Sequence, residues 1–372
     1  MKSSSGGLTS WLLEKLLEIG YVDAVLSVGR ATDESSELFG YSVAYCEDLR
    51  TRRKSQYYAS TMSEVLTFAR QHDKRFAVVG VPCYIKAART VCREDAVLAS
   101  RLVLFIGLVC GHLKTQAYAE SLAWQLGISP RELAEVDFRI KAEGRPASDY
   151  DFGARRSGES SWLRSPTRLL VGSNWGYSAF QPEACNFCDD VVAETSDVTF
   201  GDAWLPHFVE DFHGANLVIC RNRLLEGIFE TGQKRGEIVL TPLDPSEAVQ
   251  SQAGGFRYRR EGLALRLSDD IAAGLSVPRK RVRPDPRAVS FRRAALLRQR
   301  RRMARLSHAA FAEAIAAQDL TVYLGAMKKE IARYKRLDLY FARRTLVYVK
   351  RFLPRARAEK TRDREGRHHT RS

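Results

Sequence analysis

Long apolar runs are missing from the chain, and cysteine is scarce. No window approaches the roughly 20 consecutive apolar residues of a membrane-spanning helix. Glu14, Lys15 and Glu18 interrupt the apolar stretch near the N-terminus, which argues against a signal peptide. Seven cysteines in 372 residues argue against a disulfide scaffold and favour reduced thiols, metal ligands or catalysis. No nucleophile–base pair suggests a hydrolase. The chain is therefore expected to be cytoplasmic.

Acidic residues are few at the C-terminal end. Residues 279–372 hold 28 Lys and Arg against 8 Asp and Glu, which leaves 31 basic and 36 acidic residues in the remainder. The net charge of +15 and the pI of about 9.6 therefore reflect a basic tail. The body itself is predicted to be mildly acidic.

Apolar runs alternate with amphipathic segments over the first part of the chain. This order is typical of an α/β fold with a mostly parallel sheet flanked by helices. Strands are expected at residues 24–28, 41–45, 76–79, 102–108, 198–200, 216–220 and 238–240. Helices are expected at residues 8–19, 63–72, 84–91 and 116–126, and again after the strand at 216–220.

Two further regions differ from this pattern. Short alternating pieces over residues 136–171 predict a small β-rich insertion, and residues 291–307 and 311–352 predict a helical, basic C-terminal extension. The expected division is an N-terminal α/β lobe at 1–135, a second lobe at 136–277 and the extension at 278–372. The last twenty or so residues are expected to be disordered.

Four cysteines lie in patterns suited to a metal centre. Cys185 and Cys188 form a CxxC pair, which lets both sulfurs face one centre from a single turn. Cys83 and Cys110 each follow an expected buried strand and lie near an expected helix N-terminus, where the dipole favours a thiolate. Parallel neighbouring strands would bring these two loops together.

Four thiolates from three loops fit a [4Fe–4S] cluster. Structural zinc, which more often uses two CxxC pairs, remains an alternative, and the protein would then be a zinc-stabilised binding protein that acts through its basic tail. The other three cysteines, Cys46, Cys92 and Cys220, are interpreted as small buried hydrophobic residues in strands.

Five motifs occur in order along the chain and together resemble one known family. They are Ser4-Ser5-Gly6-Gly7, Gly80-Val81-Pro82-Cys83, Gly107-Leu108-Val109-Cys110-Gly111-His112, Cys185-Asn186-Phe187-Cys188 and Gly201-Asp202-Ala203-Trp204. This pattern is similar to the coenzyme F420 hydrogenase/dehydrogenase beta-subunit family, from about Ser3 to Leu267. The basic tail lies outside the resemblance.

The resemblance implies an iron–sulfur flavoprotein oxidoreductase with one [4Fe–4S] cluster and FAD. Carried over by position, the cluster ligands would be Cys83, Cys110, Cys185 and Cys188. Family members pass electrons between the cluster and a substrate or a deazaflavin, so a redox partner protein or a coenzyme F420-like carrier is expected. Many bacterial members occur in polysaccharide-biosynthesis contexts, which is a further expectation.

Flavin contacts are expected in three places. Ser4, Ser5, Gly6 and Gly7 at a helix N-terminus offer hydroxyls and free N–H groups to a pyrophosphate, with an ordinary helix cap as the alternative. Gly201 would let the flavin approach the backbone, and Asp202 would accept a hydrogen bond from the cofactor or from a ligand turn. The loop residues Lys54, Tyr57 and Asn174 are further polar candidates.

Many family members begin with an additional cysteine-rich segment that is able to bind a further cluster. Here Met1-Lys2 directly precedes the serine–glycine turn. Either the chain is a short form or its start codon lies downstream of the true one. A single cluster and a single flavin are therefore expected.

The arginine run from Arg298 to Arg305 raises the question of a partner for the tail. Nucleic acid is disfavoured, because the tail has no zinc finger, RNA-binding signature or regularly interleaved aromatics. A second interpretation attaches residues 339–352 peripherally to the acidic inner membrane surface. The favoured interpretation is a helical face that docks on an acidic partner protein or on the acidic body itself.

Overall fold

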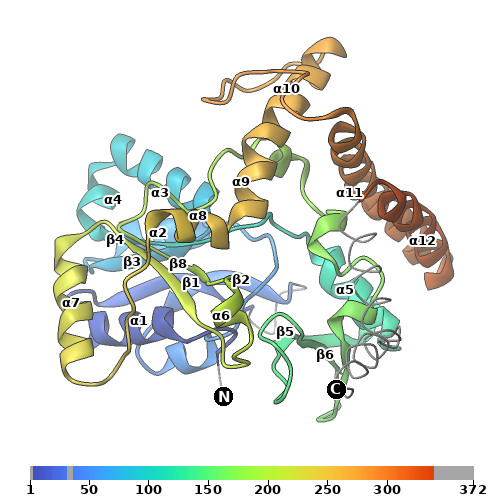
Figure 1. Ribbon diagram of the computed structural model, residues 1–372. Coiled ribbons are helices and arrows are strands. Elements are labelled where there is room, and N and C mark those ends of the chain that lie inside the picture. Colours follow the sequence, from blue (N-terminus) through green and yellow to red (C-terminus); the bar gives the residue numbers. More distant parts are fainter. Residues whose placement is uncertain (1–2, 32–36, 339–372) are drawn as a thin grey trace, which may run out of the picture.

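A six-stranded sheet forms the centre of the computed structural model, which describes residues 3–31 and 37–338 (Figure 1). Its strands lie in the order β2-β1-β3-β4-β8-β9. The four central strands are parallel, and β2 and β9 pair antiparallel at the edges. The bounds are β1 Ala24–Arg30, β2 Phe39–Ala44, β3 Phe76–Gly80, β4 Leu102–Leu108, β8 Val198–Asp202 and β9 Asn216–Cys220. The expected mostly parallel sheet is confirmed.

Helices cover both faces of this sheet, because the buried strands carry apolar residues on each side. Ala77 and Val79 of β3 pack with α1 and α7, whereas Phe76 and Val78 pack with α2, α3 and α4. The helices are α1 Leu8–Glu18, α2 Ser63–Gln71, α3 Pro82–Glu94, α4 Ala96–Arg101 and α7 Arg223–Lys234.

A second, three-stranded antiparallel sheet forms the predicted β-rich insertion, with β5 Leu133–Ile140, β6 Asp151–Arg156 and β7 Trp162–Pro166. It shares a core with α5 (Gln116–Gln125), α11 (Phe291–Ala317) and α12 (Leu320–Leu337). Figure 1 shows α11 and α12 side by side as a hairpin. The C-terminal helices therefore help to enclose a core rather than extend from the body.

Short elements connect these layers. The helices are α6 Pro206–Val209, α8 Pro245–Ser251, α9 Ala253–Arg259 and α10 Glu261–Ala272. The 3-10 turns are η1 Asp48–Thr51, η2 Pro130–Glu132, η3 Thr167–Leu169, η4 Trp175–Tyr177 and η5 Glu183–Phe187. The sequence pattern did not predict α4, α8, α9 or α10.

Three local predictions are wrong. Residues 238–240 form no strand, and Ile238 and Leu240 pack as a loop against the core that contains Phe229. The C-terminal helices are divided at Gln318, whose left-handed φ of 52° ends α11, and not between residues 307 and 311. Cys46 is exposed, not buried.

Cys92 and Cys220 lie in different elements, and the end of the tail lies outside the described residues. Cys92 lies in a helix rather than a strand, and Cys220 ends β9; both pack partly buried against core residues. The predicted helix beyond Leu337 and the disordered last twenty residues fall outside the described residues. None of the helices in the described ranges is long and apolar enough to span a bilayer.

The arginine run of α11 docks on the body of the same chain. Arg298 pairs with Asp269, and Arg301 pairs with both Asp270 and Glu183. Arg305 also pairs with Glu183, at 2.9 Å. Within the described part of the tail, the favoured interpretation of contact with the acidic body is therefore observed, and the three carboxylates pair with three of the five arginines of the run.

Candidate cofactor site and cysteine centre

The central strands end together at the edge where the candidate site lies. Gly80 of β3 stands opposite Gly107 of β4, and Leu108 of β4 stands opposite Phe200 of β8. Cys83 at the start of α3, Cys110 in the loop after β4 and Asp202 at the end of β8 lie at this edge. Parallel pairing therefore brings three distant motifs to one edge, and the sequence predicted this for the loops of Cys83 and Cys110.

Two glycines let these loops pack closely. A Cβ on Gly107 would lie 2.4 Å from the Cβ of Ala193, and one on Gly201 would lie 2.5 Å from a methyl of Val109. Gly201 thus makes room for the loop that carries Cys110. This gives the glycine a packing role besides the flavin approach expected from sequence.

The four predicted ligands are contributed by three elements. Cys83 is the second residue of α3, after Pro82 at the first helical position. Cys110 lies in the loop between β4 and α5, and not at a helix N-terminus as expected. The CxxC pair spans η5, with Cys185 inside the turn and Cys188 as its C-terminal cap.

The four thiols lie within electrostatic reach of one another. Burial raises the pKa of the Cys110 thiol to about 12; the Arg259 charge opposes this rise, and negative charge on each of the other three cysteines contributes to it. Burial likewise raises the pKa of the Cys83 thiol to about 11, with contributions from Cys185 and Cys188. Four clustered thiols, of which Cys110 is buried and Cys83 is exposed, form a site that needs a cation to stabilise its thiolates.

Several groups that stabilise negative charge already face the sulfurs. The N–H of Leu113 donates to the Cys185 Sγ at 3.4 Å, and the Arg259 Nε donates to the Cys188 Sγ at 3.3 Å. Burial alone would lower the Arg259 pKa, but charge on Cys110 and Cys188 raises it above its usual value. These donors suit thiolates rather than neutral thiols.

Four thiols could hold a zinc ion or a [4Fe–4S] cluster. Among the described residues, no three His, Cys, Asp or Glu side chains lie close enough to hold a single metal ion. Four thiolates on one zinc ion would each lie about 2.3 Å from it. A [4Fe–4S] cluster takes one thiolate on each of its four irons, so four thiolates are the donor set for either centre.

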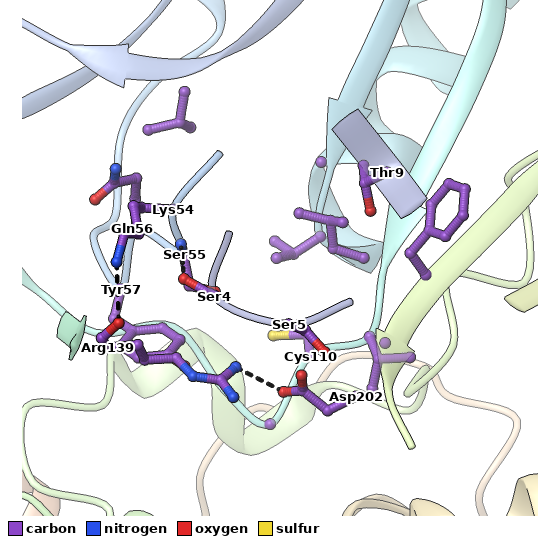
Figure 2. A pocket seen from close by; sticks show the side chains of 18 of the residues that line it. Ser4, Ser5, Thr9, Lys54, Ser55, Gln56, Tyr57, Cys110, Arg139 and Asp202 are labelled. Carbon is purple, nitrogen blue, oxygen red and sulfur yellow. Dashed lines mark hydrogen bonds and ion pairs between the residues drawn. The ribbon is translucent and has the colours of Figure 1, made fainter. Parts of the chain in front are cut away.

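A cavity of about 680 Å³ adjoins the cysteine centre. Its lining includes Ser4, Ser5, Gly7, Lys54, Tyr57, Cys110, Gly201 and Asp202. Figure 2 shows several of these side chains around the opening. Cys110 therefore belongs to both the cysteine centre and the cavity.

The serine–glycine turn is held between two loops. The Ser4 Oγ accepts a hydrogen bond from the Ser55 N–H at 2.8 Å (Figure 2), and the Ser5 Oγ donates to the Ala215 carbonyl at 3.2 Å. Gly7 has a φ of 84° and caps α1 without a side-chain bond. The serines are thus not ordinary helix caps. The N-terminal residues Gly7 and Thr9 line the cavity, and the Leu8 N–H donates to the Asn216 Oδ1 at 3.0 Å.

An ion pair crosses the cavity wall. Arg139 donates to Asp202 at 2.8 Å, and the Arg139 carbonyl accepts from the Lys54 Nζ at 3.1 Å (Figure 2). Burial alone would lower the Arg139 pKa, but charge on Tyr57 and Asp202 raises it above its usual value. Lys54 also pairs with Asp137 at 2.9 Å. The cavity wall is therefore polar and firmly held.

Aromatic rings line the wall near Cys110. Trp175 contacts the rings of Tyr57 and His112, with ring centroids 5.0 and 4.6 Å apart. The His112 Nε2 is buried and has no hydrogen-bond partner, which leaves one polar atom for a ligand. Lys114 is fully buried, and burial lowers its pKa to about 7. A flat, partly polar ring system would suit this end of the cavity.

Two predicted residues do not contribute to the site as expected. Gly6 faces Gly214 and Asn216, whose oxygens would lie 3.1 Å from an added Cβ. The Asn174 side chain accepts from the Gly176 N–H at 2.7 Å and caps η4. The close contact explains the glycine, and the cap explains the asparagine.

Sequence reasoning missed several residues of the site. They are Lys114, Arg139, Trp175, Arg259 and Arg300, all of which line the cavity or contact a cysteine. Lys114 lies four residues after Cys110 in the same loop, a signal that was available. Arg259 and Arg300 come from distant helices, and nothing in their spacing predicts the contact.

Comparison with known proteins agrees with the order of the motifs. Residues 1–67 match the family model described as "Coenzyme F420 hydrogenase/dehydrogenase, beta subunit N-term". Residues 73–246 match the model for the C terminus of the same subunit.

Two curated relatives are similar in sequence. One subunit of the F(420)H(2) dehydrogenase of Methanosarcina mazei is 34% identical over 249 residues, which are 66% of this chain and 64% of that protein. This chain therefore spans less than two thirds of that relative. The coenzyme F420-dependent sulfite reductase of Methanocaldococcus jannaschii is 33% identical over 89 residues, 24% of this chain and 14% of that protein.

A solved structure shares the fold. It is a chain of the F420-reducing [NiFe] hydrogenase complex from Methanosarcina barkeri, with a TM-score of 0.53 and 16% identity. The match covers 74% of this chain and 90% of that chain. At this identity the likeness concerns the fold alone.

Proposed function

Because the chain belongs to the coenzyme F420 hydrogenase/dehydrogenase beta-subunit family, we propose that it is an oxidoreductase subunit that transfers electrons. Electrons would pass between a [4Fe–4S] cluster on Cys83, Cys110, Cys185 and Cys188 and an FAD in the adjoining cavity. The outer donor or acceptor would be a partner protein or a deazaflavin such as coenzyme F420. A role in polysaccharide biosynthesis remains a prediction.

The observation that carries the proposal is the position of Cys110. It is one of four clustered thiols and also lines the cavity. Two redox groups bound there would be neighbours, as electron transfer requires. When bound, the flavin would supply a port for hydride or single electrons, and the cluster would supply single electrons.

The cavity residues support a dinucleotide flavin. The volume of about 680 Å³ lies in the range of cofactor pockets. Ser4 and Ser5 at the N-terminus of α1 would hold the pyrophosphate. Trp175 and Tyr57 would pack on the flavin and exclude water, and the His112 Nε2 would hydrogen-bond to it. Arg139 and Asp202 would keep the wall rigid.

Anaerobic purification with iron, sulfide and FAD quantified together tests the proposal. A brown protein with about four irons and four sulfides per chain, plus one FAD, is expected. Replacing the shared ligand, Cys110→Ser, should abolish the cluster. Cys92→Ser, which changes a cysteine of α3 outside the centre, should retain both cofactors.

The same experiment tests the cluster and the flavin independently. A colourless protein that carries zinc and no iron contradicts the cluster. A brown protein that neither retains nor takes up FAD contradicts the flavin.

A further inference from the structure

A guanidinium without a carboxylate partner faces the cysteine centre. Arg259 is only 2% exposed, and its Nε donates to the Cys188 Sγ at 3.3 Å. Its Nη1 is buried and has no hydrogen-bond partner. Within the part of the chain that the structure describes, Arg259 forms no ion pair with Asp or Glu. A buried charge of this kind is costly unless an anion lies beside it.

The anion that the surroundings offer is the cysteine centre itself. Charge on Cys110, Cys185 and Cys188 acts on Arg259. A cluster held by four thiolates is negatively charged and becomes more negative when it is reduced. A buried cation and a hydrogen bond to a ligand sulfur both stabilise the reduced form more than the oxidised form.

Packing around α9 holds this guanidinium in place. The Gln252 Nε2, just before α9, donates to the Asp202 carbonyl at 2.7 Å. A Cβ on Gly255 would lie 3.2 Å from a methyl of Val191, so the helix lies close against the loop after the CxxC pair. The Tyr258 hydroxyl is bonded to Asn186, between the two cysteines. Arg259 is therefore anchored rather than a mobile surface side chain.

We propose that Arg259 is a positioning residue that raises the reduction potential of the redox centre on the four cysteines. The inference rests on the cluster proposed above. Arg259 lies beyond residue 246, where the family match ends, so this tuning belongs to the C-terminal region of this chain. Because Arg259 is the last residue of α9, this helix would then be part of the redox site.

Potentiometric titration of the loaded protein, followed by EPR, tests the inference. Arg259→Gln should lower the midpoint potential of the cluster by about 59 mV. This shift corresponds to about a tenfold change in the equilibrium constant of one-electron reduction. Arg259→Lys retains the charge and should stay near the wild type. Arg298→Gln is the matched control, because it removes the same charge from an exposed pair with Asp269.

Each outcome decides the question. Equal potentials in the wild type and Arg259→Gln overturn the inference, and so does an equal shift in Arg298→Gln. A wild-type protein without iron contradicts the proposed cluster instead. If Arg259→Gln does not retain its cluster, wild-type protein with ¹⁵N-labelled arginine side chains decides by pulsed EPR. A ¹⁵N coupling to the reduced cluster is expected, and its absence overturns the inference.

Discussion

At the scale of single residues, the pair Arg139–Asp202 ties the insertion to the central sheet. Arg139 belongs to β5 and Asp202 ends β8, and the arginine side chain is only 4% exposed. The Arg139 Nε is buried and has no partner. Asp202 is therefore the group that compensates the charge of Arg139, so removing its carboxylate should destabilise the protein.

Asp202→Asn should destabilise the protein by about 2–3 kcal/mol, because it leaves a buried guanidinium without its counter-ion. Urea unfolding at neutral pH measures the change. The double variant with Arg139→Met should recover part of the loss. Asp23→Asn is the control, since the exposed pair Asp23–Arg75 should contribute at most about 1 kcal/mol. Equal losses in Asp202→Asn and Asp23→Asn would contradict this account.

Single residues also show how far a sequence can predict a site. The strand ends near Cys83 and Cys110 were predictable, because an apolar run followed by Gly-Val-Pro or Gly-His specifies a strand end from local chemistry alone. Arg259 was not predictable, because its partner is a sulfur 71 positions away and its own segment has no strand or cap signal. Cys46 was misassigned, because a short cysteine-ended strand gives no information about burial.

At the scale of elements, α11 is fastened to the body through Glu183. Its carboxylate accepts hydrogen bonds from both Arg301 and Arg305. Burial alone would raise the Glu183 pKa, but these arginines lower it to about 2. The ionised carboxylate therefore stabilises the docked helix at neutral pH.

Glu183→Gln should reduce stability by about 1 kcal/mol at pH 7, a modest value because Glu183 is 45% exposed. Because the pKa of Glu183 is lower in the folded protein, its carboxylate stabilises the fold fully at pH values above the unfolded pKa of about 4.3. This stabilisation is lost as the pH falls toward 2. The two proteins should therefore converge between about pH 4.5 and 2 in urea unfolding. Glu313→Gln, an exposed change on α11, should match the wild type throughout. A pH-independent difference would exclude this carboxylate as the cause.

Element boundaries show a second limit of sequence reading. The helix break was expected near residues 307–311, yet the alanines there favour helix and α11 continues to Ala317. The usable signal was Asp319, whose carboxylate caps α12 by accepting from the Thr321 N–H at 2.8 Å. Residues 238–240 were misread as a strand because a short continuous apolar run also fits a loop packed on a helix.

At the scale of the whole molecule, the C-terminal hairpin completes a core that also includes Phe39, Tyr58 and Tyr118. Phe180 packs against Phe311 and Tyr323 with ring centroids 5.5 Å apart. The Phe180 N–H donates to the Ser307 Oγ at 2.7 Å. Sequence periodicity predicted these helices but not the surface that they cover, because burial of their apolar residues depends on partners more than a hundred positions away.

A chain that ends at Arg287 should therefore lose cooperative unfolding and aggregate, since it exposes Phe180 and Tyr118. A chain that ends at Asp338 keeps every contact of α11 and α12 described above and is the control. Thermal unfolding followed by near-ultraviolet circular dichroism compares the two. An unchanged, cooperative transition in the shorter chain would mean that the hairpin is dispensable.

The distance along the chain between Phe180 and α11 also sets an order of events during synthesis. The ribosome makes the cysteine loops and the cavity walls well before residues 291–337 emerge. Until then, the wall next to Trp175 and Tyr258 lacks Arg300, which contacts both residues. If the proposed flavin binds before α11 is made, the cavity wall would gain Arg300 only after the cofactor is in place.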